Sequence, residues 1–262
     1  MKATDDGPMI NIPTLKNRWR GRVNCLRTHK RYVLGKLRGK PVAHLIHVGK
    51  TGGTALRKTL VPYVDAGRYT IFLHGHSMTL SRLRPGEKAF FFQREPLSKF
   101  LSAFYYRQRQ ARPYWHIPWR PDEALAFAQF NSANDLANAL SAADGELRAK
   151  AVHAMRSIHH VKDSVFRWLV DEAYFLSRLD DILFIGFQEQ LGQDFDALKR
   201  ILHLPDTVHL PTEDSGVYQK TPASLKYLDA TAEANLRAWY ARDIEFYELC
   251  RRIRCERRLG SS

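Results

Sequence analysis

The chain has 262 residues, and 44% of them are hydrophobic. This is enough for one α/β domain with a substantial core, and it excludes a disordered chain. Lysine and arginine number 41 against 27 acidic residues, so the formal net charge is +14. Such a surface attracts anions, which leaves three kinds of partner: an anionic nucleotide with an acidic acceptor, an anionic membrane surface, or nucleic acid. The sequence has no zinc-finger spacing and no aromatic RNA-binding signature, so nucleic acid is not expected.

Both ends of the chain are basic. Residues 1–40 are predicted to form a basic N-terminal segment, in which the stretch from Lys16 to Lys40 has no acidic residue, and residues 256–262 form a basic C-terminal tail. Residues 41–255 are predicted to form a single α/β domain. The basic ends are either solvated or docked to acidic lipid or polysaccharide.

The cysteine count and the lack of a recognisable secretory signal predict the cell compartment of the protein. Cys25, Cys250 and Cys255 show no metal-binding spacing, and an odd count without a secretory signal indicates reduced thiols. No apolar run reaches membrane-spanning length. We therefore expect a cytoplasmic protein, with peripheral association at the inner face of the membrane as one role for its basic ends.

The segment HLIHVGKTGGTALRKTL, which starts at His44, predicts a loop that holds a phosphate-like anion. An apolar strand over 42–48 leads into a Lys-Thr-Gly-Gly-Thr turn, and an amphipathic helix follows from Thr54. Glycines let the backbone approach a ligand closely, and consecutive N–H groups at a helix N-terminus attract negative charge. The residues predicted to hold the anion, by charge, hydroxyl or backbone N–H, are Lys50, Thr51, Gly52, Gly53 and Thr54.

The loop differs from that of ordinary nucleotide triphosphatases. Their pattern, G-x-x-x-x-G-K-[ST], would need a glycine where His44 stands. Here Lys50 opens the loop and the glycines follow it, which is the reverse polarity. No hydrophobic strand ending in aspartate stands out as a magnesium partner, although Asp180 and Asp181 precede a strand. The pattern therefore disfavours an ordinary ATPase or GTPase.

The segment FLHGHSM, from Phe72, supplies candidate bases. It follows a predicted strand over 69–73, and the carboxyl ends of strands in open α/β sheets face the ligand crevice. A sugar hydroxyl is a poor nucleophile until its proton is removed, and histidine titrates near the working pH. His74 and His76 are thus candidate catalytic groups, with a structural hydrogen bond at the turn as the alternative role for either.

The segment KAFFFQREPLSKFLSAFYYR, from Lys88, is a second strand-turn-helix unit. The strand is predicted over 88–93, because a short apolar and aromatic run is bounded by turn signals. Pro96 suits the first turn of a helix that reaches about residue 110. Arg94 and Ser102 are predicted to clamp a second phosphate, since arginine gives a forked contact and serine a directional one.

Together, HVGKTGGT and QREPLSKFLSAFYY resemble the paired nucleotide motifs of the sulfotransferases that use 3′-phosphoadenosine 5′-phosphosulfate (PAPS). The match of motifs covers residues 42–108, with a weaker match over 180–250. The Lys-Thr-Gly-Gly-Thr form is similar to the carbohydrate branch of Golgi-type and bacterial enzymes, and the His-Gly-His is similar to the heparan and dermatan 2-O-sulfotransferases. The resemblance implies an α/β fold of P-loop type, three-layered, with a central, mainly parallel sheet flanked by helices.

The resemblance also implies a reaction. A sulfuryl group would pass from PAPS to a hydroxyl of a carbohydrate, glycolipid or related, including anionic, acceptor, without a metal, leaving 3′-phosphoadenosine 5′-phosphate. The first loop would hold the 5′-phosphosulfate, and Arg94 with Ser102 the 3′-phosphate. His76 would be the base, with His74 second, and Lys50 would stabilise the leaving phosphate oxygen. Golgi members carry a signal-anchor helix, which this chain lacks, so a bacterial cytoplasmic enzyme is expected.

Residues 111–180 are predicted to be a helical insertion that forms one wall of the acceptor cleft. Its first part, ARPYWHIPWRP, is rich in aromatic residues such as Trp115, which either stack on a sugar or pin the loop to the surface; His116 is a further polar contact. The helix caps expected here are Asn134, Asp144 and Asp163. The histidines expected to have surface or packing roles are His153, His159 and His160.

The last third is predicted to return to the sheet. A central strand is expected over 182–185, followed by a helix that buries Phe195, Leu198 and Leu202, and a final helix over 231–252. Glu189 is read as a helix-start acid or an aid to substrate positioning. By resemblance, the loop between these helices closes over the nucleotide, which makes Tyr218, Lys220 and Thr221 cofactor contacts.

Two other classes of function stay open at this point. One is a kinase of the same fold superfamily, which would use ATP and magnesium and ignore a 3′-phosphate. The other is a non-catalytic anion-binding or membrane-docking protein that retains the loops.

Overall fold

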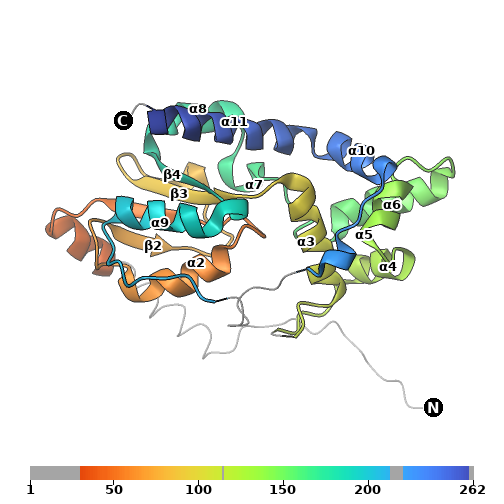
Figure 1. The fold of residues 1–262 in the computed structure, drawn as a ribbon, viewed down its shortest axis with the longest axis horizontal. Coiled ribbons are helices and arrows are strands. Elements are labelled where there is room, and N and C mark those ends of the chain that lie inside the picture. Colours follow the sequence, from red (N-terminus) through yellow and green to blue (C-terminus); the bar gives the residue numbers. More distant parts are fainter. Residues whose placement is uncertain (1–29, 114, 213–220, 260–262) are drawn as a thin grey trace, which may run out of the picture.

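The computed structural model describes residues 30–113, 115–212 and 221–259 of the chain. They form an α/β fold around a four-stranded, all-parallel sheet of order β2-β1-β3-β4 (Figure 1). The strands are β1 (Val42–Ile46), β2 (Thr70–Leu73), β3 (Lys88–Gln93) and β4 (Ile182–Phe187). All five residues of β1 are buried, which is why it reads as a continuous apolar run, as strands covered on both faces do.

The strand order places a switch point between β1 and β3. After β1 the chain crosses through α2 (Gly53–Leu60) to β2 on one side, and β3 then returns to the other side of β1. His44 of β1 therefore pairs with Phe72 on one side and with Ala89 on the other. In open parallel sheets, ligands bind outside the carboxyl ends of the strands at such a point.

The prediction of a central strand over 182–185 is wrong in its position. β4 pairs with β3 alone and forms the edge of the sheet. Its apolar sequence arises because helices cover both of its faces, so composition does not distinguish it from a central strand. Its outer side is approached by the last helix, where Arg257 donates to the carbonyl oxygen of Ile182 at 2.6 Å.

Helices pack on both faces of the sheet (Figure 1). On one face, α2 and α9 (Leu191–Leu202) bury Leu56 and Phe195 against Phe90. On the other, α7 (Phe166–Leu169), α8 (Glu172–Ser177) and α11 (Ala241–Leu259) bury Phe175 and Phe246 against Phe91. The expected buried stripe of α9 is confirmed, since Phe195, Leu198 and Leu202 are all buried.

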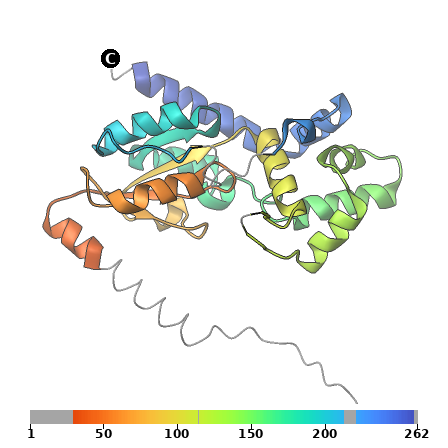
Figure 2. The ribbon, with the colours of Figure 1, turned by 60° about the horizontal axis from the view of Figure 1, so that its bottom comes forward.

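A helical lobe lies beside the sheet (Figure 2). It consists of α3 (Pro96–Gln108), α4 (Pro121–Gln129), α5 (Ala133–Ala139), α6 (Gly145–Ser157) and α10 (Ala230–Trp239). The short 3-10 helices of the fold are η1 (Val61–Tyr63), η2 (Leu80–Arg82), η3 (Leu179–Asp181), η4 (Gln188–Gln190) and η6 (Ala223–Leu225). The helical character predicted for residues 111–180 is confirmed in α4, α5 and α6.

The helix caps and the final helix differ from the predictions. Asp144 caps α6 as expected, but Ser132 caps α5, and Asn134 instead donates to Asp229 at the start of α10. Asp163 caps no helix among the described residues and pairs with Arg167. The final helix is two helices, α10 and α11, separated at Tyr240. The hydroxyl of Tyr240 donates to the Val161 carbonyl at 2.8 Å, so a tertiary contact sits at the break.

The end of the basic N-terminal segment belongs to the fold. Residues 30–37 are helical, and Arg31 donates to the carbonyl oxygen of Ile71 in β2 at 2.7 Å while its guanidinium lies 4.5 Å from the Phe72 ring. None of the helices in the described ranges is long and apolar enough to cross a membrane.

A buried ion pair between Arg107 and Glu123 joins α3, the helix that follows β3, to α4. Both side chains are almost fully buried, and the Arg107 guanidinium donates to both carboxylate oxygens of Glu123, at 2.6 and 2.7 Å. Arg107 also donates to the carbonyls of Ile117 and Pro118, and the backbone N–H of His159 donates to Glu123. The pair therefore fixes the position of α3 and α4. It also fixes the aromatic-rich loop over residues 111–121, called the aromatic loop below, and the start of the segment after α6.

Removing one partner of this pair should destabilise the lobe strongly. Arg107→Met leaves the Glu123 carboxylate buried without its counter-charge, which typically costs about 3–5 kcal/mol. Urea unfolding at neutral pH measures the effect. The control is Arg237→Met, because Arg237 pairs with Glu233 at the surface, where such a pair contributes about 0–1 kcal/mol. Equal unfolding free energies for the two variants would contradict this account.

Candidate functional site

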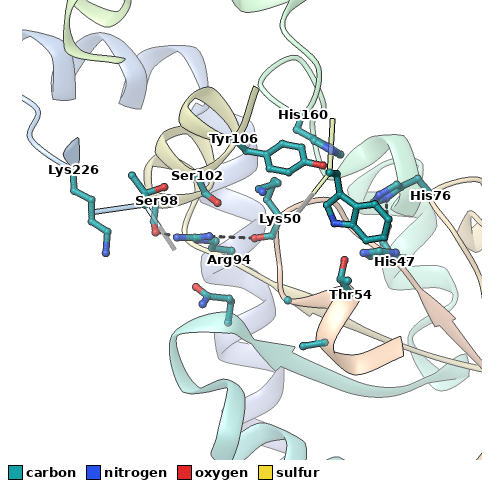
Figure 3. Close-up of a pocket in the computed structure, with 16 residues that line it drawn as sticks. His47, Lys50, Thr54, His76, Arg94, Ser98, Ser102, Tyr106, His160 and Lys226 are labelled. Atoms are coloured by element: carbon teal, nitrogen blue, oxygen red, sulfur yellow. Dashed lines mark hydrogen bonds between the residues drawn. The ribbon is translucent and has the colours of Figure 1, made fainter. Parts of the chain in front are cut away.

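A polar cavity lies at the switch point of the sheet (Figure 3). Its volume is about 440 Å³, and the loops after β1, β2, β3 and β4 all contribute to its lining. The charged and titratable residues that line it are His47, Lys50, His76, Arg94, Tyr106, His160 and Lys226. None of the lining residues that the structure describes is a carboxylate, so this part of the cavity is suited to an anion.

The loop between β1 and α2 turns tightly because of its glycines. Gly52 has φ of 86° and forms the N-cap of α2, whose first turn receives no side-chain cap. A β-carbon at Gly53 would lie 2.1 Å from the His47 ring, so only glycine lets the loop fold against that histidine. Thr54 lines the cavity, whereas Thr51 is buried and donates to the carbonyl of Val48 at 3.0 Å.

Lys50 places a desolvated positive charge against the cavity. Its φ is 66°, and its ammonium lies 3.8 Å from the centroid of the Tyr106 ring, a cation–π contact. No described carboxylate forms an ion pair with it. Burial, followed by the charges of Arg94 and Arg109, lowers the pKa of Lys50 to about 7. A bound anion would reverse that shift, because it stabilises the charged ammonium.

Arg94 connects the two predicted anion loops. Its Nη1 donates to the carbonyl oxygen of Lys50 at 3.3 Å, and its Nε donates to the Ser98 hydroxyl at 3.0 Å (Figure 3). Ser98 and Ser102 both line the cavity. The structure thus brings Arg94 and Ser102 together as the sequence predicts, and it adds Ser98, one helical turn earlier. Burial lowers the pKa of Arg94, because its guanidinium has little contact with water.

The turn before α3 is held by carboxylates outside the cavity lining. Glu95 caps α3 through the backbone N–H groups of Leu97 and Ser98. Glu189 accepts from the backbone N–H of Glu95 at 2.8 Å and from the hydroxyl of Tyr247 at 3.3 Å. Glu189 therefore positions the Arg94 turn. Because Glu95 already occupies these helix N–H groups, an anion here would be bound by the side chains of Arg94 and the serines.

His76 faces the cavity in a defined tautomer. Its Nδ1 lies 3.0 Å from the carbonyl oxygen of His47, and a carbonyl can only accept, so Nδ1 carries the proton and Nε2 is left as an acceptor. Trp168 fixes the same segment by donating to the His76 carbonyl. Burial lowers the pKa of His76, although the His47 carbonyl opposes this, so the ring is neutral and able to accept a proton.

His74 is directed away from that cavity. Its Nε2 lies 2.8 Å from Nδ1 of His44, and Nε2 of His44 lies 3.1 Å from Glu87. Burial, with His44 next, lowers the pKa of His74 to about 4. The structure therefore brings one of the two predicted catalytic histidines to the cavity and places the other in a buried chain that ends on a carboxylate.

The sequence did not single out several of the residues that line the cavity. His47 is buried, and burial lowers its pKa to about 3. His160 was expected on the surface or in packing, as His153 is, yet it lines the cavity. The only sequence signal for His160 is the unusual His-His pair that follows α6. Tyr106 carried no signal beyond an aromatic residue in a helix.

The mouth of the cavity carries Trp115, which is 57% exposed, and Lys226. Trp119 packs against Phe127, and His116 is exposed and bonded to Gln110, so the aromatic loop both pins itself to the lobe and presents one ring to the cavity. Thr221, which the resemblance makes a cofactor contact, lines the cavity. The other two predicted cofactor contacts, Tyr218 and Lys220, lie outside the described residues.

One group of side chains has the spacing of a metal site. Donor atoms of His159, His160 and Asp163 lie within 4.8 Å of one another. Arg167 already donates to Asp163 at 2.5 Å, and the charge of Lys50 acts on His160. Two neighbouring cations make this a poor environment for a divalent ion.

No protein-family model matches the chain, and no curated protein matches it significantly. The site must therefore be interpreted from its own geometry.

The unpaired charge of Lys50 should weaken the ligand-free protein. The pKa of Lys50 is lowered from 10.5 to about 7, so the unfolded chain binds more protons, and stability rises with pH between these values. Lys50→Met should raise the free energy of unfolding by up to a few kcal/mol at pH 6, at about 1.4 kcal/mol for each pKa unit, and the gain should shrink by pH 10. Urea unfolding at both pH values measures this.

The matched control is Lys58→Met, because Lys58 is exposed on the neighbouring helix α2. It should leave stability within about 0.5 kcal/mol at both pH values. If Lys50→Met lowered the free energy of unfolding at pH 6, the charged Lys50 ammonium would be stabilising the folded protein, which would contradict this account.

Proposed function

We propose that the protein is a PAPS-dependent sulfotransferase that transfers a sulfuryl group to a hydroxyl of a carbohydrate, glycolipid or related acceptor. One observation carries the proposal. The Lys50 loop and Arg94 are hydrogen-bonded to each other and face one cavity whose described lining has no carboxylate. A nucleotide with phosphate groups at both ends of its ribose fits two linked cationic sites.

The order of the elements supports the same assignment. A loop between the first strand and its helix, at the switch point of a parallel sheet, is where α/β proteins hold phosphate groups. We therefore assign the fold to the P-loop type, with three layers. In this arrangement the Lys50 loop and the start of α2 hold the 5′-phosphosulfate, and Arg94, Ser98 and Ser102 hold the 3′-phosphate.

The proposed transfer proceeds in line. The acceptor oxygen forms a bond to sulfur while the bond between sulfur and the 5′-phosphate oxygen breaks, and its electron pair remains on the phosphate. Lys50 stabilises the charge that develops on that oxygen. Nε2 of His76, the free acceptor of a neutral ring, takes the hydroxyl proton. No step in this sequence needs a metal ion.

The magnesium-dependent kinase alternative finds less support in the site. In a nucleotide triphosphatase the threonine after the loop lysine binds magnesium, but Thr51 is buried and bonded to Val48. The described lining offers no aspartate or glutamate as a further ligand.

The acceptor side is the mouth of the cavity near His76. Trp115 lies there with an exposed ring, and flat aromatic faces offer large contact area at low entropy cost. This supports an acceptor with a ring such as a sugar.

Nucleotide selectivity tests the first part of the proposal. In calorimetry without magnesium, 3′-phosphoadenosine 5′-phosphate should bind at least about tenfold more tightly than ADP, since a charged hydrogen bond contributes about 1.5–3 kcal/mol. Arg94→Ala should remove the preference, while Arg148→Ala, a change at an exposed arginine of α6, should keep it. Equal binding of both nucleotides, or binding of ATP only with magnesium, would favour the kinase instead.

Turnover tests the second part. His76→Gln should reduce kcat for sulfuryl transfer by about 10²–10⁴-fold, because general-base catalysis contributes that range, while nucleotide affinity stays near that of the parent. His153→Gln, a change at an exposed histidine of α6, is the control. Binding of PAPS without turnover in the parent, against a panel of sugar acceptors, would indicate the non-catalytic alternative.

A further inference from the structure

The segment between α6 and α7 places a third imidazole, that of His160, in the cavity beside those of His47 and His76. His160 is buried and has φ of 69°, a left-handed conformation that is uncommon for a residue with a side chain. Its ring centroid lies 5.4 Å from that of His76 and 5.9 Å from that of Tyr106. The ring approaches the Lys50 loop so closely that a β-carbon at Gly49 would lie 2.9 Å from Nδ1 of His160.

Asp163 lies behind this ring. Nδ1 of His160 and Oδ2 of Asp163 are both buried without a hydrogen-bond partner among the described residues, and they lie 3.6 Å apart. A shift of a few tenths of an ångström would let Nδ1–H donate to the carboxylate, and Nε2 of His160 would then be the free acceptor. The other oxygen of Asp163 is fixed by Arg167.

A carboxylate partner distinguishes His160 from the other cavity histidines. His76 is backed by a backbone carbonyl, and Nδ1 of His47 has no partner in the described structure. A carboxylate stabilises an imidazolium far better than a neutral carbonyl does, as in hydrolases that use a histidine–aspartate pair. Burial of Asp163 alone would raise its pKa, but the nearby His160 ring and the hydrogen bond from Arg167 keep the pKa well below its usual range.

In the empty cavity the ring is neutral. Burial lowers the pKa of His160 to about 4, with Asp163 opposing and the charges of His159, Lys50 and His76 adding to the effect. Tyr106 packs against it from α3. A polyanionic nucleotide would offset the charge of Lys50 and so raise the affinity of His160 for a proton.

We propose that His160, backed by Asp163, is the group on which the acceptor proton comes to rest, and that His76 passes the proton to it. The inference rests on the proposed function. As the oxygen–sulfur bond forms, the hydroxyl proton moves to Nε2 of His76, and then, through a hydrogen bond or one water molecule, to Nε2 of His160. The electron pair of the broken sulfur–oxygen bond stays on the 5′-phosphate. His160 becomes an imidazolium that Asp163 stabilises.

The decisive variant is Asp163→Asn, which keeps the shape of the side chain and removes its charge. We expect kcat to fall by about 10²-fold, with the affinity for 3′-phosphoadenosine 5′-phosphate unchanged by calorimetry. The acidic limb of the pH–rate profile should also move: loss of the carboxylate lowers the proton affinity of His160, so the rise of kcat with pH should shift to lower pH. The control is Asp196→Asn, the same change at an exposed carboxylate of α9, which should leave that limb in place.

His160→Asn provides a second readout should the aspartate variant fail to fold. Its kcat should fall similarly, and added imidazole should restore part of it, which a purely structural role would not allow. Turnover within twofold of the parent and an unmoved pH profile in both variants would overturn the proposal. Bound zinc in the purified protein, with activity lost on chelation and the zinc lost in Asp163→Asn, would overturn it in favour of a metal site. If the nucleotide does not bind the parent at all, the proposed function itself has failed.

Discussion

The constraint on which the site depends is buried positive charge without a buried counter-charge. Lys50 and Arg94 are both largely removed from water and lie next to each other, and no described carboxylate lines their cavity. Desolvation of an unpaired cation costs free energy. The protein meets that cost with contacts from the Tyr106 ring, the Lys50 carbonyl and the Ser98 hydroxyl. At Arg94, the charges of Glu189 and Glu95 outside the lining also oppose the effect of burial.

The sheet explains how two loops far apart in sequence meet. β1 and β3 are neighbours although β2 lies between them in the chain, so their following loops open on the same side of the same crevice. Carboxylates are used nearby, but outside the lining: Glu95 caps α3, and Glu189 holds the Glu95 backbone. They fix the geometry of the Arg94 turn while the cavity itself stays cationic.

The helical lobe supplies the opposite wall. Arg107 follows Tyr106 directly on α3, the helix that also carries Ser98 and Ser102. Its partner Glu123 on α4 also accepts from the backbone N–H of His159. One buried ion pair thus connects the helix that carries the serines with the segment that presents His160. The wall of the cavity that carries His160 is therefore coupled mechanically to the wall that carries Ser98 and Ser102.

The sequence by itself determined the local features of this protein. The strand over 88–93, the glycine turn around Lys50, and the placement of Arg94 and Ser102 follow from periodicity, turn chemistry and charge within about ten residues.

Only the tertiary structure decided the rest. It separated His76, in the cavity, from His74, in the chain to Glu87, and it placed β4 at the sheet edge and His160 in the wall. These outcomes depend on which distant segments pack together. Alternation along a strand or helix shows that a residue is buried, but the identity of its neighbours is set by contacts across 30 to more than 100 positions, such as His44 with His74 and Gln93 with Cys250.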